Sequence, residues 1–131
     1  MKPNEVITGW LIKPEERSIE KVEVRADSEG SILQDLYKHL QCEYVDVGRH
    51  GLTYLPSKPD DDIWFDDEGL FKNYECCFEI PMWVPIWGRG LILGYNHLGD
   101  STSSTLTNLD MEELFRTIRF HTVTQETENE A

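Results

Sequence analysis

The chain has 131 residues, of which 39% are hydrophobic and 11% aromatic, and its formal net charge is −13 at pH 7. A chain of this size and composition can bury one core, so the values exclude global disorder and predict a single domain. The charge argues against direct binding to nucleic-acid phosphates or anionic membranes, because both need clustered Lys and Arg. Two interpretations of the charge stay open: solubility alone, or attraction of a basic partner.

The three cysteines, Cys42, Cys76 and Cys77, match neither a disulfide framework nor a common zinc spacing. Neighbouring residues of a strand point to opposite faces, so Cys76 and Cys77 cannot chelate one ion together. We expect reduced, partly buried thiols in an intracellular protein. The stretch MKPNEVITGW lacks the apolar run of a signal peptide, and nothing approaches the roughly 20 apolar residues of a membrane span. The sequence therefore predicts a soluble, cytoplasmic protein.

The first part of the chain predicts a hairpin followed by a helix. Residues 6–13 (VITGWLIK) are rich in β-formers, and residues 18–25 (SIEKVEVR) alternate apolar and charged side chains. Together they predict an antiparallel hairpin. Ser31 and Gln34 then fit a capping box, and apolar residues recur at helical spacing, which predicts a helix over about 31–41.

Strands are predicted to dominate the middle of the chain. The segments CEYVDVGRH (42–50) and GLTYLP (51–56) each favour a strand, and SKPDDD (57–62) favours a loop. The segment IWFDDEGLFK (63–72) predicts a strand, an Asp-Asp-Glu-Gly turn and a second strand. NYECCFEIP (73–81) predicts a further strand.

The last part of the chain predicts a buried strand and a second helix. The run Leu91, Ile92, Leu93 is typical of a fully buried central strand. Thr107 with Asp110 predicts the start of a helix that covers LDMEELFRTIRF. We expect its apolar side to carry Leu109, Leu114, Phe115 and Ile118. Residues 122–131 predict a flexible acidic tail after a single domain, 1–121.

This order of elements is not an alternating βαβα series, so the predicted class is α+β with a mainly antiparallel, strongly curved sheet. One form of such curvature is a small partial barrel. The first helix follows the first hairpin, and a short second helix lies near the carboxyl terminus.

Several ordered segments resemble a family of small proteins found mainly in bacteriophages, prophages and plasmids, characterised only as a domain of unknown function. They are ITGWLIKP, the helix SILQDLYKHLQCEYVDV, IWFDDEGLFKN, GRGLILG and GDSTSSTLT. The chain departs from the family pattern by inserting PSKPDD before the acidic segment and by lacking an Asn-Arg pair after the lysine. The resemblance implies an origin as a mobile-element accessory protein and carries no activity.

The decamer DDDIWFDDEG, residues 60–69, holds six acids in ten positions. A calcium loop is excluded because Trp64 and Phe65 stand where a ligand and the turning glycine belong. In a strand the acids split between two faces, so we expect no metal site. Solvated strand ends with a hairpin turn, and an anionic rim that meets a partner, both remain open. The candidate interface residues are Asp60, Asp61, Asp62, Asp66, Asp67 and Glu68.

The tripeptide Gly88-Arg89-Gly90 precedes an apolar strand instead of joining a strand to a helix, so it predicts a bulge or close backbone approach, not a phosphate loop. Arg89 could still present its planar fork to a carboxylate or phosphate. The loop 99–104 offers hydroxyl and N–H groups for a small ligand, or forms a Ser/Thr-rich turn into the second helix. The candidate ligand-binding residues are Arg89, Asn96, Asp100, Ser101 and Thr102.

Aromatic residues are frequent between residues 64 and 87, and most are expected in the core. Pro81 and Pro85 stand beside Trp83 and Trp87, which predicts an irregular edge where a tryptophan anchors an interface. The histidines are scattered, and nothing in the sequence pairs a cysteine with a base. We therefore predict no catalytic residues and no cofactor.

These observations favour a non-enzymatic, acidic protein-interaction module of mobile-element origin that acts in the bacterial host cytoplasm. Its partner would be a basic host or phage protein, and inhibition by DNA mimicry is one form of such modulation. The alternative is a small-ligand or nucleotide-binding protein that uses the Gly-Arg-Gly strand and the Ser/Thr-rich loop. A homodimer closed through an exposed tryptophan edge also remains open.

Overall fold

The computed structural model describes residues 1–48, 61–81 and 85–123. The strand expected at residues 51–56, Asp60, Trp83 and residues 124–131 of the expected tail therefore lie outside the described residues. In chain order the elements are β1 (Val6–Lys13), β2 (Ser18–Arg25), α1 (Leu33–Leu40), β3 (Val45–Gly48), β4 (Asp61–Asp66), the 3-10 helix η1 (Gly69–Phe71), β5 (Cys76–Glu79), β6 (Ile86–Trp87), β7 (Gly90–Tyr95), β8 (Ser101–Thr102), α2 (Asn108–Thr117) and β9 (Arg119–Thr122).

The larger sheet is antiparallel throughout and has the order β2-β1-β7-β4-β3, with β8 paired to the end of β7. The hairpin β1–β2 has the bounds expected from its sequence, and its register runs from Val6 opposite Arg25 to Lys13 opposite Ser18. The first helix follows this hairpin and the second lies near the carboxyl terminus. The α+β class with a mainly antiparallel sheet is confirmed.

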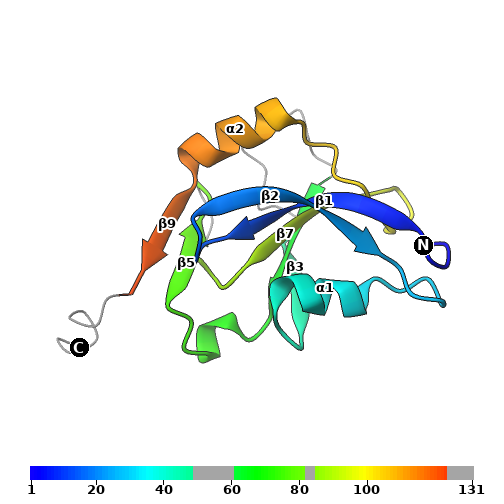
Figure 1. Ribbon diagram of the computed structural model, residues 1–131, viewed down its shortest axis with the longest axis horizontal. Helices are drawn as coiled ribbons and strands as arrows, with labels where there is room; N and C mark the ends of the chain where they lie inside the picture. Colours follow the sequence, from blue (N-terminus) through cyan, green and yellow to red (C-terminus); the bar gives the residue numbers. More distant parts are fainter. Residues whose placement is uncertain (49–60, 82–84, 124–131) are drawn as a thin grey trace.

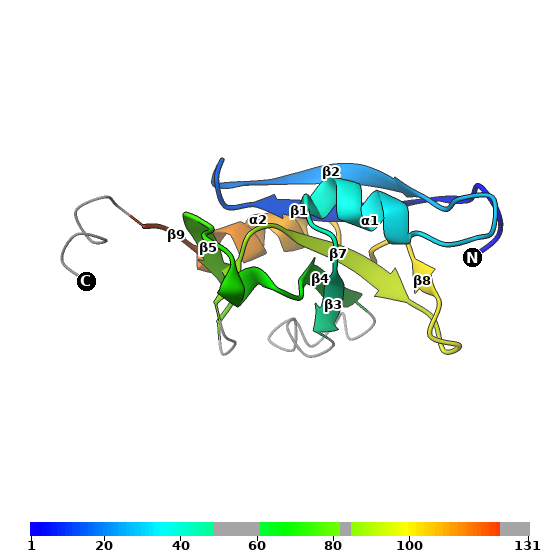
Figure 2. The ribbon, with the colours of Figure 1, turned by 90° about the horizontal axis from the view of Figure 1, so that it is seen from below.

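A second antiparallel sheet has the order β6-β5-β9. Figure 2 shows β5 and β9 at one end of the larger sheet and β8 at the other. Neither sheet closes on itself or curls strongly in the described part of the chain, so the expected strong curvature and partial barrel are not confirmed. The physical reason is that β5, β6 and β9 form a separate sheet instead of extending the first one.

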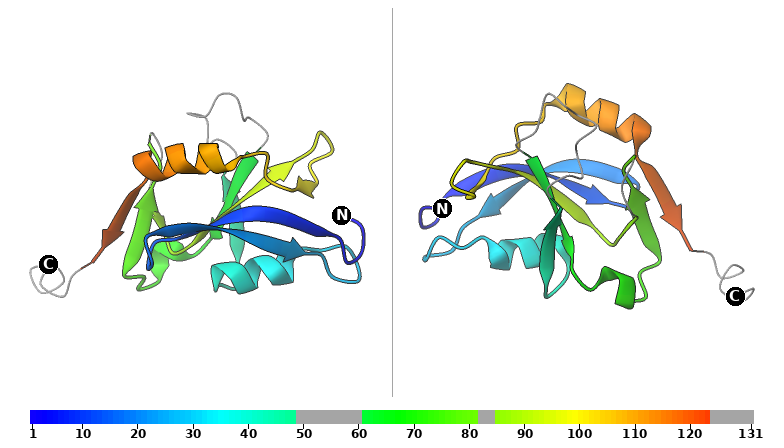
Figure 3. Two further views of the ribbon diagram at one scale, coloured as in Figure 1. Left: turned by 45° about the horizontal axis from the view of Figure 1, so that its top comes forward. Right: turned by 180° about the vertical axis from the view of Figure 1, so that it is seen from behind.

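Strand β7 is the centre of the larger sheet, as its apolar run predicts. Side chains alternate between the faces of a strand, so Leu91 and Leu93 face one core while Ile92 faces the other. Helix α1 covers one face and α2 covers the other, an arrangement visible in Figures 1 and 3. The α1 core consists of Ile7, Leu11, Val24, Ala26, Ile32, Leu36, Leu40, Cys42, Leu91 and Leu93. The α2 core consists of Trp10, Ile12, Ile63, Phe78, Ile80, Ile86, Ile92, Leu106, Met111, Leu114 and Ile118.

The two sheets meet at the first residue of β7. A Cβ atom at Gly90 would lie 2.6 Å from Cζ of Phe78, which belongs to β5. Gly88 has a φ of +93°, and a Cβ atom there would lie 3.0 Å from the Tyr74 ring. Close backbone approach, one of the two structures predicted for this tripeptide, is therefore confirmed.

Helix α1 begins differently from its predicted capping box. Its N-cap is Ile32, and no side chain caps it. Ser31 Oγ instead accepts a hydrogen bond from the N–H of Leu33 at 3.3 Å, and the Asp35 carboxylate accepts one from the N–H of Arg25 at 2.7 Å. The first turn is thus tied to the end of β2.

Helix α2 has the predicted start, because Thr107 and Asp110 form a complete capping box. Its apolar side differs from the expected one. Leu114 and Ile118 are buried, whereas 75% of Leu109 and 49% of Phe115 are exposed. Met111 takes the remaining place in the core, since it lies on the same face as Leu114.

Two segments differ from their predicted elements. Residues 69–71 form the 3-10 helix η1 instead of a second strand, because β3 and β7 already occupy both edges of β4. Residues 119–122 form strand β9 and pair with β5 instead of continuing the helix. The N–H of Val123 also bonds to the carbonyl of Glu75 at 2.7 Å, so ordered pairing extends past residue 121, where the single domain was expected to end.

Leu109 and Leu114 provide a matched test of this packing, because the same truncation falls on opposite sides of one helix. We expect Leu114→Ala to lower the free energy of unfolding by about 2–5 kcal/mol, since it leaves a cavity in the α2 core. Leu109→Ala should change it by less than about 0.5 kcal/mol. Urea denaturation followed by circular dichroism measures both, and equal losses would contradict the described orientation of α2.

Candidate functional site

Three aspartates of the acidic decamer are buried instead of lining an exposed rim. Asp61, Asp62 and Asp66 are 2%, 3% and 4% exposed, because β4 is an interior strand of the larger sheet. A partner therefore cannot contact their carboxylates in this structure. Asp67 and Glu68, which follow the strand, are exposed as expected.

Asp61 holds the segment that leads into α2. Its carboxylate accepts hydrogen bonds from the Ser104 hydroxyl, the Thr105 hydroxyl and, at 3.1 Å, the Thr105 N–H. Several charge-assisted hydrogen bonds offset the desolvation of a buried carboxylate. Part of the Ser/Thr-rich loop is thus a structural brace between β4 and α2.

Asp66 is the centre of a second buried network. Its Oδ2 accepts hydrogen bonds from Nζ of Lys72 at 2.8 Å and from the hydroxyl of Tyr74 at 2.6 Å, while Oδ1 accepts from the Glu68 N–H at 2.9 Å. Burial by itself raises the pKa of Asp66, but the hydrogen bonds from Lys72, Tyr74 and Glu68 outweigh it and hold the pKa below its usual value. Burial, followed by the hydrogen bond to Asp66, raises the pKa of Tyr74. The carboxylate therefore stays charged and the phenol stays neutral at pH 7.

Four exposed acids, Glu43, Asp46, Asp67 and Glu68, lie where β3 begins and β4 ends. The carbonyl of Tyr44 accepts a hydrogen bond from the N–H of Asp67 at 3.1 Å, which joins the two segments. Tyr44 is 58% exposed, and Phe71 in η1 is 87% exposed. We call this surface the acidic–aromatic patch; it consists of Glu43, Tyr44, Asp46, Asp67, Glu68 and Phe71. Within residues 1–48, 61–81 and 85–123, no ion pair joins any of its four acids to a cation.

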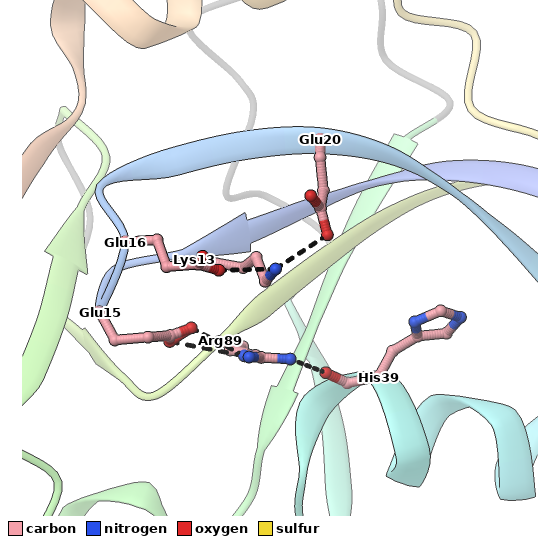
Figure 4. A network of polar contacts seen from close by, with 6 residues as sticks. All are labelled: Lys13, Glu15, Glu16, Glu20, His39 and Arg89. Carbon is pink, nitrogen blue, oxygen red and sulfur yellow. Dashed lines mark hydrogen bonds and ion pairs between the residues drawn. The ribbon is translucent and has the colours of Figure 1, made fainter.

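Arg89 has a structural role (Figure 4). Its Nε donates to Oε1 of Glu15 at 2.8 Å, and its Nη1 donates to the carbonyl of His39 at 3.1 Å. The guanidinium therefore ties the β1–β2 turn and the last turn of α1 to the start of β7. Its side chain is only 17% exposed, so little of it remains for a ligand.

The other predicted ligand-binding residues lie far from Arg89. The side chain of Asn96 accepts hydrogen bonds from the N–H groups of Leu98 and Asp100 at 2.9 and 3.0 Å, which closes the β7–β8 turn. Ser101 and Thr102 form β8. Arg89 precedes β7 and Asn96 follows it, so their backbones are up to about 23 Å apart at a strand rise of about 3.3 Å per residue. The structure does not bring these five residues into one site.

The hollows on the described surface include the following. One, of about 690 Å³, separates α2 from the β1–β2 turn and includes Arg17, Arg116 and Phe115. The second, about 590 Å³, is lined by Gly69, Lys72, Asn73, Tyr74, Glu75, Trp87 and Val123. The third, about 270 Å³, shares Asn73, Tyr74 and Glu75 with the second and reaches Glu15 and Arg89. Trp87 is half-buried, and Trp83 lies outside the described residues.

The described residues offer little for metal or thiol chemistry. Among them, no group of three or more His, Cys, Asp and Glu side chains is placed to hold a metal ion. Burial, followed by the charge of Asp66, raises the pKa of Cys42 to about 11, and burial raises the pKa of Cys77. Both thiols are therefore protonated at pH 7 and are weak nucleophiles. No helix in the described ranges is long and apolar enough to cross a membrane.

Sequence reasoning missed the exposed aromatics of the acidic–aromatic patch. It placed Phe71 in a strand, although η1 leaves the sheet and exposes the side chain. It also missed Tyr74 as the partner of Asp66, eight residues along the chain. Asp66, Lys72 and Tyr74 flank a Gly-containing turn, and this spacing indicates that the three side chains can meet. The sequence does not specify the hydrogen bonds that they form.

Comparisons of the chain with models of protein families, with curated proteins and with solved structures find no match.

The buried Asp66 network predicts a pH-dependent stability. Because folding lowers the pKa of Asp66 below its ordinary value of 3.8, its stabilising contribution is complete above that pH and is lost as the pH falls toward the folded-state pKa. Asp66→Asn should lower the unfolding free energy by about 1–3 kcal/mol at pH 7. Urea titrations from pH 7 to pH 2.5 should show the difference from the unmodified protein shrinking below about pH 4; a constant difference would disagree.

The Arg89 tie predicts an energetic coupling with Glu15. In a double-mutant cycle of Arg89→Gln and Glu15→Gln, we expect a coupling of about 1 kcal/mol, because the pair is partly exposed. Arg119→Gln, at an exposed arginine, is the control for loss of a positive charge, and it should show no coupling to Glu15→Gln. Thermal denaturation of the four proteins of each cycle measures the coupling free energy. If the stability losses of Arg89→Gln and Glu15→Gln are purely additive, the interaction between the two side chains is contradicted.

Proposed function

We propose that this protein is a non-enzymatic interaction module that binds a basic protein partner through the acidic–aromatic patch. The observation that carries this proposal is the exposure of Phe71, at 87%, beside Asp67 and Glu68, whose carboxylates form no ion pair with any cation in the described ranges. An exposed aromatic side chain within a charged rim is the usual composition of an interface anchor.

The aromatic side chains supply the apolar part of the binding energy. Removing a phenylalanine side chain from water contributes about 1.5–3 kcal/mol to a binding free energy. This contribution is available at Phe71 because the side chain is not buried by the fold. Tyr44 adds a second exposed ring, held to the same end of the sheet by its carbonyl bond to Asp67. A partner that covers both rings would gain the free energy of removing them from water, because the fold leaves them exposed.

The charges determine which partner fits. Lys72 follows the patch closely in sequence, but its ammonium group is bonded to the buried carboxylate of Asp66. The net charge of −13 steers a positively charged partner toward the molecule and repels nucleic-acid phosphates. One such partner is a basic protein that binds nucleic acid. The acids of the patch would cover its nucleic-acid site and inhibit it by imitating the charge of the phosphates. An origin in a mobile element, implied by the resemblance of the sequence, is compatible with such a modulator.

This proposal predicts a salt-sensitive interaction that depends on the patch. The immobilised protein should retain basic proteins from a bacterial lysate at low salt, and purified partners should bind with an affinity that falls as ionic strength rises. The variant Asp67→Asn/Glu68→Gln should weaken this binding about tenfold, and Phe71→Ala should weaken it about five- to tenfold. Isothermal titration calorimetry measures each affinity.

The matched control is Glu29→Gln, which removes an exposed acid from the turn between β2 and α1. It should leave the affinity within about twofold, because a distant rim charge contributes little. Equal losses for Glu29→Gln and for Asp67→Asn/Glu68→Gln would show that only the overall charge matters, and the patch proposal would fail. Absence of any basic partner at low salt would also refute it.

A further inference from the structure

The hollow beside η1 is continuous with the acidic–aromatic patch, because Gly69 and Lys72 at its wall belong to the same turn as Glu68 and Phe71. Its volume of about 590 Å³ lies within the range of about 300–1,000 Å³ that is usual for ligand pockets. It is therefore large enough to accept a side chain from any protein that docks on the patch.

The two charged residues in the wall of this hollow differ in their contacts. Lys72 donates to the buried carboxylate of Asp66 at 2.8 Å and lies 6.0 Å from the centre of the Tyr74 ring. Its charge is therefore compensated inside the protein. Glu75 is exposed, and no ion pair or side-chain hydrogen bond joins it to another described residue. Among the described residues, the carboxylate of Glu75 in the wall of the hollow thus has no compensating cation.

The aromatic walls are held in place by the fold. The hydroxyl of Tyr74 donates to Asp66 at 2.6 Å, and the ring packs against Gly88, where a Cβ atom would come within 3.0 Å. Trp87 is paired with Cys77 in the β6–β5 ladder, and its carbonyl lies next to Gly69. Because the Tyr74 ring and the backbone of Trp87 are held before binding, a ligand loses less free energy in ordering this wall.

We propose that this hollow is the anchor site for an arginine side chain of the basic partner, an inference that rests on the proposed function. The planar guanidinium stacks on aromatic faces and donates paired hydrogen bonds to a carboxylate, here that of Glu75. A lysine ammonium is more strongly hydrated and cannot make the paired contact, so the hollow selects arginine over lysine. The negative field of the whole molecule acts in the same direction.

The test uses fluorescein-labelled peptides of nine arginines, nine lysines and nine citrullines, with fluorescence anisotropy at two salt concentrations. The unmodified protein should bind the arginine peptide about fivefold or more tightly than the lysine peptide, because only arginine stacks and pairs at the same time. Citrulline keeps the shape of arginine without its charge, and its peptide should bind at least about tenfold more weakly than the arginine peptide.

Two variants probe the hollow. Glu75→Gln should reduce the affinity for the arginine peptide about tenfold, since it removes the charged acceptor. Trp87→Leu keeps an apolar side chain but removes the aromatic face, and it should reduce the affinity about fivefold and diminish the preference for arginine. Glu29→Gln is the control for a lost acid and should change the affinity less than about twofold. Thermal denaturation establishes that each variant is folded.

The outcomes separate this inference from the proposed function. If Asp67→Asn/Glu68→Gln and Phe71→Ala weaken peptide binding while Glu75→Gln and Trp87→Leu do not, the arginine site is refuted and the patch stands. If the unmodified protein binds the two cationic peptides equally well, the selective hollow is also refuted. If no variant differs from the unmodified protein, both proposals fail. Losses at Glu75 and Trp87 that are confined to the arginine peptide support the site.

Discussion

The structure depends on one strand that is buried on both faces and bonded along both edges. Strand β7 pairs with β1 and β4, while Leu91 and Leu93 join the α1 core and Ile92 joins the α2 core. Every other layer is placed relative to it. Helix α1 covers one side, and the second sheet approaches the other through the contact between Gly90 and Phe78. A glycine at this position is required because two layers meet at a single backbone residue.

Buried carboxylates organise the connections around this centre. Asp61 fixes the segment that leads into α2, and Asp66 fixes the turn that carries Lys72 and Tyr74. These buried acids stabilise the fold through hydrogen bonds. The negative charge of the chain is therefore divided between buried structural carboxylates and exposed ones. Asp67 and Glu68 of the same segment are exposed and belong to the surface through which we propose that a partner binds. Buried and exposed acids are thus adjacent in one short segment.

Much of the fold could be predicted from the sequence because its elements have strong local signals. The alternation in residues 18–25, the apolar run at Leu91–Leu93 and the capping pair Thr107–Asp110 each specify an element without tertiary information. The bounds of the β1–β2 hairpin and the start of α2 follow from these patterns.

The candidate site could be predicted only in part, because burial and pairing depend on tertiary contacts. Periodicity placed acids on both faces of β4 but could not show that Asp61 and Asp66 would find hydroxyl and ammonium donors. For the same reason Arg89 was a candidate ligand-binding residue, whereas Glu15 and the His39 carbonyl occupy its donors. The turn after β4 was recognised, but the exposure of Phe71 follows from the occupied edges of that strand.

The pairing of β1 with β7 has a consequence for synthesis of the chain. Trp10 lies opposite Ile92, so the first strand leaves the ribosome long before its central partner is made. Until then, the nascent hairpin and α1 expose the apolar edge that β7 later covers. Such an edge is open to wrong pairing with other chains, and non-local pairing of this kind slows folding. The charges on β2 and in the β1–β2 turn are therefore suited to keep the early intermediate dispersed while translation is completed.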